Sequence, residues 1–176
     1  MNKYQHIILI GMPACGKSSI GTSLSAKLSI PLYDTDLMLE EQYSQSITNI
    51  FIDIGEAQFR MNESAKLQDV IGRESGVISL GGGGVLAPPN RDIIKDNNLV
   101  FYIKASVPTL VRNLSDDSRR PLLEGYEDKG KRLTELLNQR AAIYNECCNF
   151  VINVDELSPH EAAQKIINEI SNENII

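Results

Sequence analysis

The sequence lacks any apolar run near its amino terminus that could span a bilayer or direct secretion. A spanning helix needs about 20 apolar residues, whereas Met1 to His6 lead only into a short apolar segment. We therefore expect a cytoplasmic protein that does not bind membranes.

Basic residues are also few, because the chain has 17 Lys and Arg against 23 Asp and Glu, which gives a formal net charge of −6. Affinity for a nucleic-acid backbone depends on clustered Lys and Arg. This balance argues against a general nucleic-acid binder, so any basic groups that converge must do so locally.

Cysteine is scarce too, with a lone Cys15 and an adjacent pair, Cys147 and Cys148. Their spacing fits neither a disulfide framework nor a metal site, so we expect free thiols in a reducing compartment. With 176 residues, 42% hydrophobic and 6% aromatic, the chain suits one compact domain over residues 1–176. We expect this domain to be a monomer.

The sequence does contain a regular alternation of short aliphatic segments and longer segments of helical period. This pattern is typical of an α/β protein in which helices cover a parallel sheet. Five strands are predicted, at residues 7–10, 31–33, 77–80, 99–103 and 150–154. Near the carboxyl end, Ser158 and Glu161 form a capping box, so a helix should begin at Pro159.

The strongest motif is Gly11-Met-Pro-Ala-Cys-Gly16-Lys17-Ser18, which fits the Walker A pattern. It follows the first predicted strand and opens the first predicted helix, so its amides and the positive helix end face one point. Gly11 and Gly16 let the backbone curl around phosphate oxygens, Lys17 would span the β- and γ-phosphates, and Ser18 would bind Mg²⁺. An ordinary glycine turn is the alternative.

Asp34-Thr35-Asp36 lies where the second predicted strand ends, and ligands of open parallel sheets bind at the carboxyl ends of strands. In extended structure both carboxylates can point the same way, one toward the metal and one toward a phosphate acceptor. The alternative is that Asp36 caps a helix that starts at Leu37.

Four glycines, Gly81 to Gly84, follow the third predicted strand. Without side-chain bulk, a ligand can lie against this backbone and accept hydrogen bonds from its amides. A flexible loop is the alternative.

Two arginines are candidates for binding a carboxylate. Arg140 shares a helical face with Leu133, Leu137 and Tyr144, so its guanidinium must meet an anion or remain a buried, unpaired charge. Arg60 lies at the border of another apolar face. Arg is the preferred bidentate partner of carboxylates, so the pair would select an acidic substrate, with structural ion pairing as the alternative for each.

A polar stretch at about residues 115–131 interrupts the periodicity and is the predicted mobile lid. Within it, Arg119 and Arg120 precede Pro121. On closure they would bring a cation over the transferring phosphoryl group, although a solvated surface charge is the alternative.

In this order the motifs resemble those of the shikimate kinases, from Ile7 to about Ile170. The match rests on GMPACGKSS, DTD, FIDIGEAQFR from Phe51, SLGGG from Ser79, RPLL from Arg120, and Arg140 with Tyr144. The resemblance implies a three-layer P-loop fold with a five-stranded parallel sheet in the order 2-3-1-4-5. It also implies a helical substrate-binding region at about residues 34–62, besides the lid.

The resemblance further implies that ATP phosphorylates the 3-hydroxyl of shikimate, with Mg²⁺ as cofactor and these two small molecules as the only partners. The catalytic residues would be Lys17, Asp36 and Arg120, and the metal would be held by Ser18 and Asp34. ATP would be bound by Gly11, Pro13, Ala14, Cys15, Gly16, Lys17, Ser18, Ser19 and Arg120. Shikimate would be bound by Asp36, Arg60, Gly81, Gly82, Gly83 and Arg140. The segment from Asp155 to Pro159, where the family contacts adenine, matches weakly.

Two other functions fit parts of this pattern. A gluconate kinase-like enzyme shares the phosphate loop and an early acidic pair, but it would not require the GE-FR segment or RPLL in this arrangement. A nucleotide-binding regulatory module without catalysis is the other alternative, because a fold alone does not establish activity.

Overall fold

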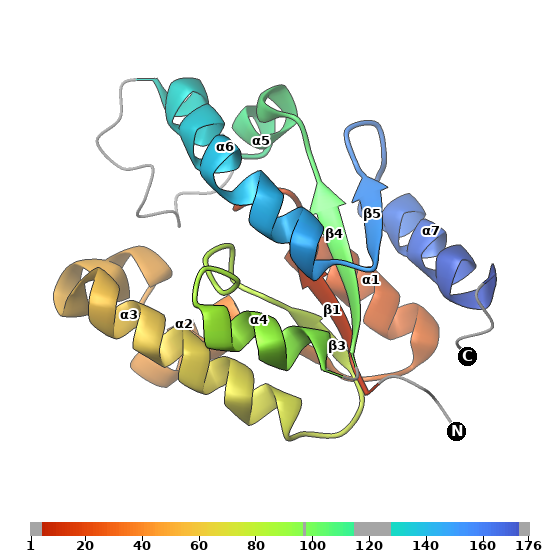
Figure 1. Cartoon of the computed structure of the whole chain (residues 1–176), viewed down its shortest axis with the longest axis horizontal. Helices are drawn as coiled ribbons and strands as arrows, with labels where there is room; N and C mark the ends of the chain where they lie inside the picture. Colours follow the sequence, from red (N-terminus) through yellow and green to blue (C-terminus); the bar gives the residue numbers. More distant parts are fainter. Residues whose placement is uncertain (1–4, 97, 115–127, 173–176) are drawn as a thin grey trace.

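The computed structural model describes residues 5–96, 98–114 and 128–172. Its five parallel strands form one sheet in the order β2-β3-β1-β4-β5 (Figure 1), which confirms the predicted order. All five predicted strands are present, with ends that differ by at most one residue from the prediction. They are β1 (Ile7–Ile10), β2 (Leu32–Asp34), β3 (Val77–Ser79), β4 (Leu99–Lys104) and β5 (Phe150–Asn153).

Helices cover both faces of the sheet (Figure 1). One face carries α1 (Lys17–Leu28) and α7 (Pro159–Asn172), which pack against each other, and the other carries α4 (Pro88–Lys95) and α6 (Lys129–Cys147). Among the helices of the described residues, none has the length and apolar character needed to cross a membrane. The three-layer α/β architecture is the one predicted.

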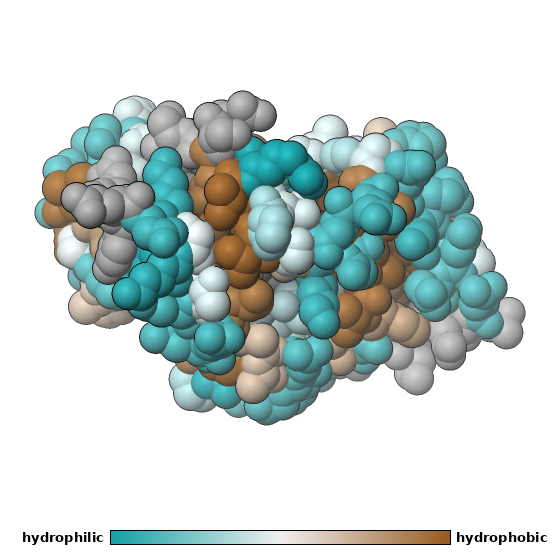
Figure 2. All heavy atoms as spheres, turned by 90° about the horizontal axis from the view of Figure 1, so that it is seen from above, coloured by the Kyte–Doolittle hydropathy of each residue, from teal (hydrophilic) through white to brown (hydrophobic). Residues whose placement is uncertain are grey.

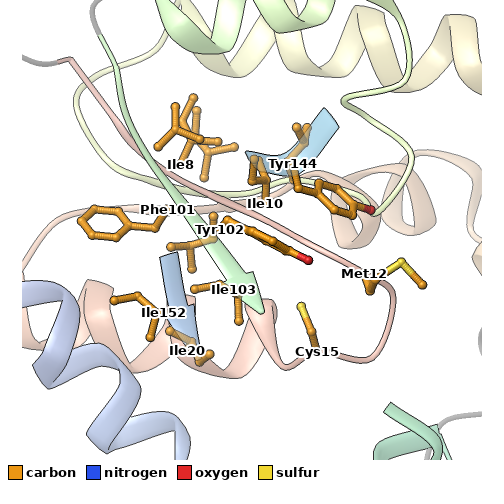
Figure 3. Close-up of a cluster of buried hydrophobic side chains, with 14 of the residues drawn as sticks. Ile8, Ile10, Met12, Cys15, Ile20, Phe101, Tyr102, Ile103, Tyr144 and Ile152 are labelled. Carbon is orange, nitrogen blue, oxygen red and sulfur yellow. The ribbon is translucent and has the colours of Figure 1, made fainter. Parts of the chain in front are cut away.

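The core is formed by strands that are buried on both faces (Figure 3). Ile8 and Ile10 of β1 and Tyr102 of β4 are each at most 1% exposed. Continuous aliphatic strands of this kind are typical of parallel sheets covered on both sides. The phosphate loop belongs to the same core, because the side chains of Met12 and Cys15 are buried in it.

A second, smaller apolar cluster lies between α2 (Thr35–Tyr43) and α3 (Ile47–Ile71). It contains Leu39, Ile47, Ile50 and Phe59. Gly55 interrupts α3 with φ 76° and ψ 165°, a conformation that favours glycine, so the helix bends between the turns that carry Ile50 and Phe59. This bend lets α3 pack against α2 before it continues along α4.

The capping box of α7 is confirmed. The Ser158 amide donates to Oε2 of Glu161 at 2.8 Å, and the Glu161 amide donates to Oγ of Ser158 at 3.3 Å. The helix begins at Pro159, as its sequence predicts.

Candidate active site

The Walker A motif forms the turn between β1 and α1, and two of its glycines have backbone conformations that other residues rarely adopt. Gly11 has φ 149° and Gly16, which immediately precedes α1, has φ 93°. A Cβ at Gly11 would overlap the carbonyl oxygen of Ile103 in β4. The loop is therefore held against the sheet, and the amino end of α1 opens beside it.

Lys17 folds over this loop. Its Nζ donates to the carbonyl oxygens of Gly11 at 3.0 Å and Met12 at 2.9 Å, and it lies 3.6 Å from Sγ of Cys15. Ser18, in the first turn of α1, is exposed. An ammonium group binds anionic phosphate oxygens more strongly than neutral carbonyl oxygens. We therefore expect Lys17 to leave these carbonyls and bind phosphate when a nucleotide is present.

A cleft of about 380 Å³ lies at this end of the molecule. Figure 2 views the end to which the strands point and shows a largely hydrophilic surface crossed by hydrophobic bands. Of the predicted ATP-binding residues, six line the cleft: Ala14, Cys15, Gly16, Lys17, Ser18 and Ser19. Gly11 and Pro13 are not in the lining. Among the described residues, the other members of the lining are Ile20, Asp36, Ser79, Thr109, Arg112, Asn113, Val154, Leu157 and Pro159.

Sequence reasoning missed the wall formed by α5 (Val107–Leu114). Thr109, Arg112 and Asn113 of this helix face the cleft, and Nδ2 of Asn113 donates to the carbonyl of Ala14 at 2.9 Å. One signal could have identified them. The helix follows the carboxyl end of β4, the sheet edge at which ligands of parallel sheets bind.

Asp34 and Asp36 differ in what they contact. Oδ1 of Asp34 accepts from the amides of Asp36 at 3.1 Å and Leu37 at 3.2 Å, so Asp34 caps α2. The alternative that Asp36 caps a helix starting at Leu37 is therefore wrong, because the chain turns into α2 at Thr35, directly after β2. Asp36 is helical rather than extended, so the strand-alternation argument does not apply, yet its side chain still lines the cleft with Lys17.

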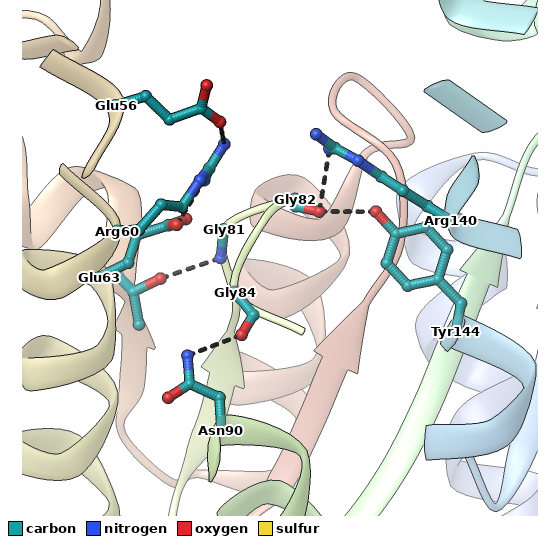
Figure 4. Close-up of polar contacts among 10 residues, drawn as sticks. Glu56, Arg60, Glu63, Gly81, Gly82, Gly84, Asn90, Arg140 and Tyr144 are labelled. Carbon is teal, nitrogen blue, oxygen red and sulfur yellow. Dashed lines mark hydrogen bonds and ion pairs between the residues drawn. The ribbon is translucent and has the colours of Figure 1, made fainter. Parts of the chain in front are cut away.

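The glycine loop after β3 is held by side chains of several helices (Figure 4). The Gly81 amide donates to Oγ1 of Thr35 in α2 at 3.0 Å, and the Gly84 carbonyl accepts from Nδ2 of Asn90 in α4 at 2.8 Å. The Gly82 carbonyl accepts from two side chains of α6. These bonds argue against the flexible-loop alternative.

Arg60, on α3, borders the glycine loop and already has acidic partners (Figure 4). Its Nη1 lies 2.5 Å from Oε2 of Glu63 and its Nη2 lies 3.3 Å from Oε1 of Glu56. A Cβ at Gly83 would overlap the Arg60 guanidinium. The ion-pairing alternative is therefore realised at Arg60, although five N–H donors leave it capacity for a further anion.

Glu63 is the acidic residue of this site that sequence reasoning missed. Its side chain is 4% exposed, and burial raises its pKa to about 7, with Arg60 lowering it and Asp36 raising it. A Cβ at Gly81 would meet the carboxylates of both Asp36 and Glu63. A signal was available, since Glu63 falls on the apolar face of Phe59 and three residues after Arg60.

Arg140 of α6 is 4% exposed, so its guanidinium is turned inward as its helical face predicts. Nη1 of Arg140 donates to the Gly82 carbonyl at 3.2 Å, and the Tyr144 hydroxyl donates to the same oxygen at 2.6 Å (Figure 4). Within residues 5–96, 98–114 and 128–172, no ion pair is recorded for Arg140. Arg140 also lowers the pKa of the Glu63 carboxyl electrostatically, although no direct ion pair joins them among the described residues. A buried guanidinium whose recorded hydrogen bond goes to a neutral carbonyl is suited to an anionic ligand.

The third predicted arginine lies outside the described residues. Both arginines of the predicted lid, Arg119 and Arg120, lie in the part of the chain that the structure does not describe. Of the lid itself, only residues 128–131 are described. Asp128 caps α6 by accepting from the Lys131 amide at 2.9 Å.

Comparison with known proteins identifies one family. A model of the shikimate kinase family matches residues 13–171. A shikimate kinase of Thioalkalivibrio sulfidiphilus is 37% identical over 171 residues, covering 97% of this chain and 87% of that protein. A solved shikimate kinase from Acinetobacter baumannii, in complex with shikimate, superimposes with a TM-score of 0.93 at 29% identity, covering 98% of this chain and 96% of that one.

One further comparison bears on the gluconate kinase alternative. A gluconokinase from Sinorhizobium meliloti has a TM-score of 0.61 at 14% identity, covering 99% of this chain and 97% of that one, so it shares the fold alone. The family match begins at residue 13, within the phosphate loop, and includes the rest of that loop and the arginine-lined site. This chain belongs to the shikimate kinase family of ATP-dependent phosphotransferases.

Proposed function

We propose that the cleft transfers the γ-phosphate of ATP to the 3-hydroxyl of shikimate, and that the residues around it divide the task as follows. One observation carries the assignment. Asp36 lines the nucleotide cleft together with Lys17 and Ser18, and its carboxylate also lies against Gly81 of the glycine loop. This position supports a nucleotide site and a neighbouring site for the organic acid that share the Asp36 side chain, as direct transfer requires.

The phosphate loop and the amino end of α1 bind the triphosphate, and Lys17 neutralises charge on its terminal oxygens. The nucleoside lies between α5 and the segment before α7, since Arg112, Val154 and Pro159 line that part of the cleft. By the family resemblance, Arg120 adds a second cation over the transferring phosphoryl group.

Ser18 and Asp34 are the proposed contacts of Mg²⁺. The residues fit such an ion, because Ser18 is exposed beside the phosphate loop and Oδ2 of Asp34 is buried with no hydrogen-bond partner among the described residues. Mg²⁺ keeps several waters and is held by few carboxylates together with substrate phosphates, so a dense cluster of acidic ligands is not required. When bound, the ion offsets charge on the phosphate oxygens.

Arg60 and Arg140 bind the carboxylate of shikimate from opposite sides of the glycine loop. Each already contacts that loop, Arg60 at Gly83 and Arg140 at the Gly82 carbonyl. Fixing the carboxylate presents the hydroxyl group to the γ-phosphorus, and such positioning supplies much of the rate of a phosphoryl transfer.

Asp36 orients that hydroxyl and accepts its proton as the new P–O bond forms. Its place between Gly81 and the nucleotide cleft supports this assignment. Because phosphoryl transfer passes through a loose transition state, we assign Asp36 mainly an orienting task, with proton removal late in the reaction.

The testing experiment is a panel of acids assayed for ADP release by the purified protein with ATP and Mg²⁺. We expect turnover with shikimate and none with gluconate. Turnover with gluconate alone would favour the gluconate kinase alternative, and ADP release with neither acid would favour a non-catalytic module.

We also propose that the protein acts as a cytoplasmic monomer. Light scattering at working concentrations should give a mass near that of one chain, and a stable dimer mass would contradict this.

A further inference from the structure

The Gly82 carbonyl is the point at which α6 contacts the glycine loop. It accepts from Nη1 of Arg140 at 3.2 Å and from the hydroxyl of Tyr144 at 2.6 Å (Figure 4). A carbonyl oxygen has two lone pairs, so these two donors use its capacity and fix the direction of the peptide group. The orientation of this peptide is therefore set by two residues one helical turn apart.

Tyr144 is itself held firmly. Its side chain is 1% exposed, and its ring stacks on that of Tyr102 in β4, with centroids 5.1 Å apart (Figure 3). Burial raises the pKa of Tyr144 well above its usual range, so the hydroxyl stays protonated and remains a donor. Stacking on Tyr102 of the sheet thus positions the Tyr144 ring, and the Tyr144 hydroxyl in turn positions the glycine loop at Gly82.

Gly82 also contacts the phosphate loop, because a Cβ at this position would meet the ring of Pro13 at 2.8 Å. A shift of the Gly82 peptide would therefore change the distance between the acid site and the nucleotide site. It would also move the acceptor that holds the Arg140 guanidinium. Small displacements of this kind are costly in phosphoryl transfer, which depends on alignment.

We propose that Tyr144 is a positioning residue for the organic acid: by holding the Gly82 carbonyl, it sets the direction of the Arg140 guanidinium. The inference rests on the proposed function, since it assigns Arg140 to the substrate carboxylate. Tyr144 itself need not touch the substrate. Its effect is expected on binding of the acid rather than on binding of ATP.

The test compares the same substitution, tyrosine to phenylalanine, at the two stacked tyrosines, so that each variant loses only its hydroxyl group. Tyr144→Phe removes the hydroxyl that contacts Gly82 and keeps the ring, whereas Tyr102→Phe removes a hydroxyl for which no hydrogen bond is recorded among the described residues. We expect Tyr144→Phe to raise the KM for shikimate about 3- to 10-fold, the range for loss of one hydrogen bond, with the KM for ATP unchanged. Tyr102→Phe should leave both KM values unchanged.

A double-mutant cycle tests whether Tyr144 acts through Arg140. In an Arg140→Ala background, Tyr144→Phe should have little further effect on the KM for shikimate. Full additivity of the two changes would overturn the inference, as would an unchanged KM for shikimate in Tyr144→Phe alone. Equal rises in both KM values with a lowered melting temperature would also overturn it, since that result indicates general loss of structure. In each of these outcomes the wild-type protein still phosphorylates shikimate, so only this inference fails. If the wild-type protein did not phosphorylate shikimate, the proposed function and this inference would both be wrong.

Discussion

Nη1 of Arg60 lies 2.5 Å from Oε2 of Glu63, three residues further along α3. Burial raises the pKa of this carboxyl to about 7, while Arg60 opposes the shift and Asp36 adds to it. Near neutral pH, Glu63 therefore exchanges its proton beside the proposed site of an anionic substrate. We therefore expect the binding of the substrate to depend on pH through this ion pair.

We predict that the KM for shikimate rises as pH increases from about 6 to about 8, on either side of the Glu63 pKa of about 7. A bound carboxylate disfavours the charged form of Glu63, so binding raises its pKa and is tighter when the group is protonated. If binding raises that pKa by about one unit, the affinity changes by up to about 10-fold. The measurement is a series of KM determinations across this pH range.

Two amide variants separate the buried carboxyl from its exposed neighbour. Glu63→Gln keeps an acceptor for Arg60 but cannot ionise, so its KM for shikimate should be flat with pH. Glu56→Gln serves as the control, because Glu56 is 59% exposed and its charge is screened by water. A pH slope that persists unchanged in Glu63→Gln would exclude this carboxyl as its source.

The second prediction concerns Asp36. Asp36→Asn replaces one of the two acceptor oxygens by an NH2 group and cannot take up the proton, so it impairs both the orientation of the hydroxyl and the removal of its proton, and kcat should fall by about 100-fold or more. ATP affinity, measured by nucleotide titration, should stay near the wild-type value. Asp53→Asn, an exposed change on α3, is the control. Near-normal turnover in a coupled ADP assay would remove Asp36 from the mechanism.

The third prediction concerns stability. His6 is 2% exposed, its Nδ1 has no hydrogen-bond partner among the described residues, and burial lowers its pKa from 6.5. The unfolded chain therefore binds a proton at higher pH than the folded chain does. The free energy of unfolding should fall as pH drops through about 6.5.

His6→Phe tests this, because phenylalanine keeps a ring beside Tyr33 but cannot be protonated. Its melting temperature should depend less on pH between about 7 and about 5 than that of the wild type. His160→Gln, at an exposed position in the first turn of α7, should keep the wild-type dependence. Identical slopes for wild type and His6→Phe would assign the acid sensitivity to other groups.

The sheet could be predicted from the sequence because its central strands, β3, β1 and β4, are buried on both faces. Such strands are continuous aliphatic segments bounded by turn residues. The Walker A motif directly follows the first of them, so it indicated that β1 leads into the phosphate loop. The inward direction of Arg140 was predictable for a similar reason, since Leu133 and Tyr144 mark its helical face. Local periodicity was sufficient in both cases.

Contacts between distant segments were not predictable in this way. Which of Asp34 and Asp36 caps α2 depends on the residue at which β2 ends, and a shift of one residue reverses the answer. The role of Glu63 could not be predicted because it depends on the packing of α3 beside the glycine loop, which brings the Glu63 carboxylate close to Gly81. The wall formed by α5 likewise depends on the arrangement of strands at the edge of the sheet.

The last prediction concerns the nucleotide wall. Oδ1 of Asp155 accepts from the amide of Ser106, the residue before α5, at 2.7 Å, and this hydrogen bond lowers the pKa of Asp155. It joins two segments that both line the cleft, one through Arg112 and the other through Leu157. Losing it should let these segments separate.

Asp155→Ala should therefore raise the KM for ATP about 3- to 10-fold, the range for loss of one ordinary hydrogen bond, while kcat and the KM for shikimate change little. Glu156→Ala is the matched control, because this neighbouring acid is exposed and no contact is recorded for it among the described residues. Asp155→Asn, which keeps an acceptor oxygen, should fall between wild type and Asp155→Ala. If the KM for ATP is the same in all three variants, the segment before α7 is held by its packing alone, because the charged hydrogen bond then contributes nothing to nucleotide binding.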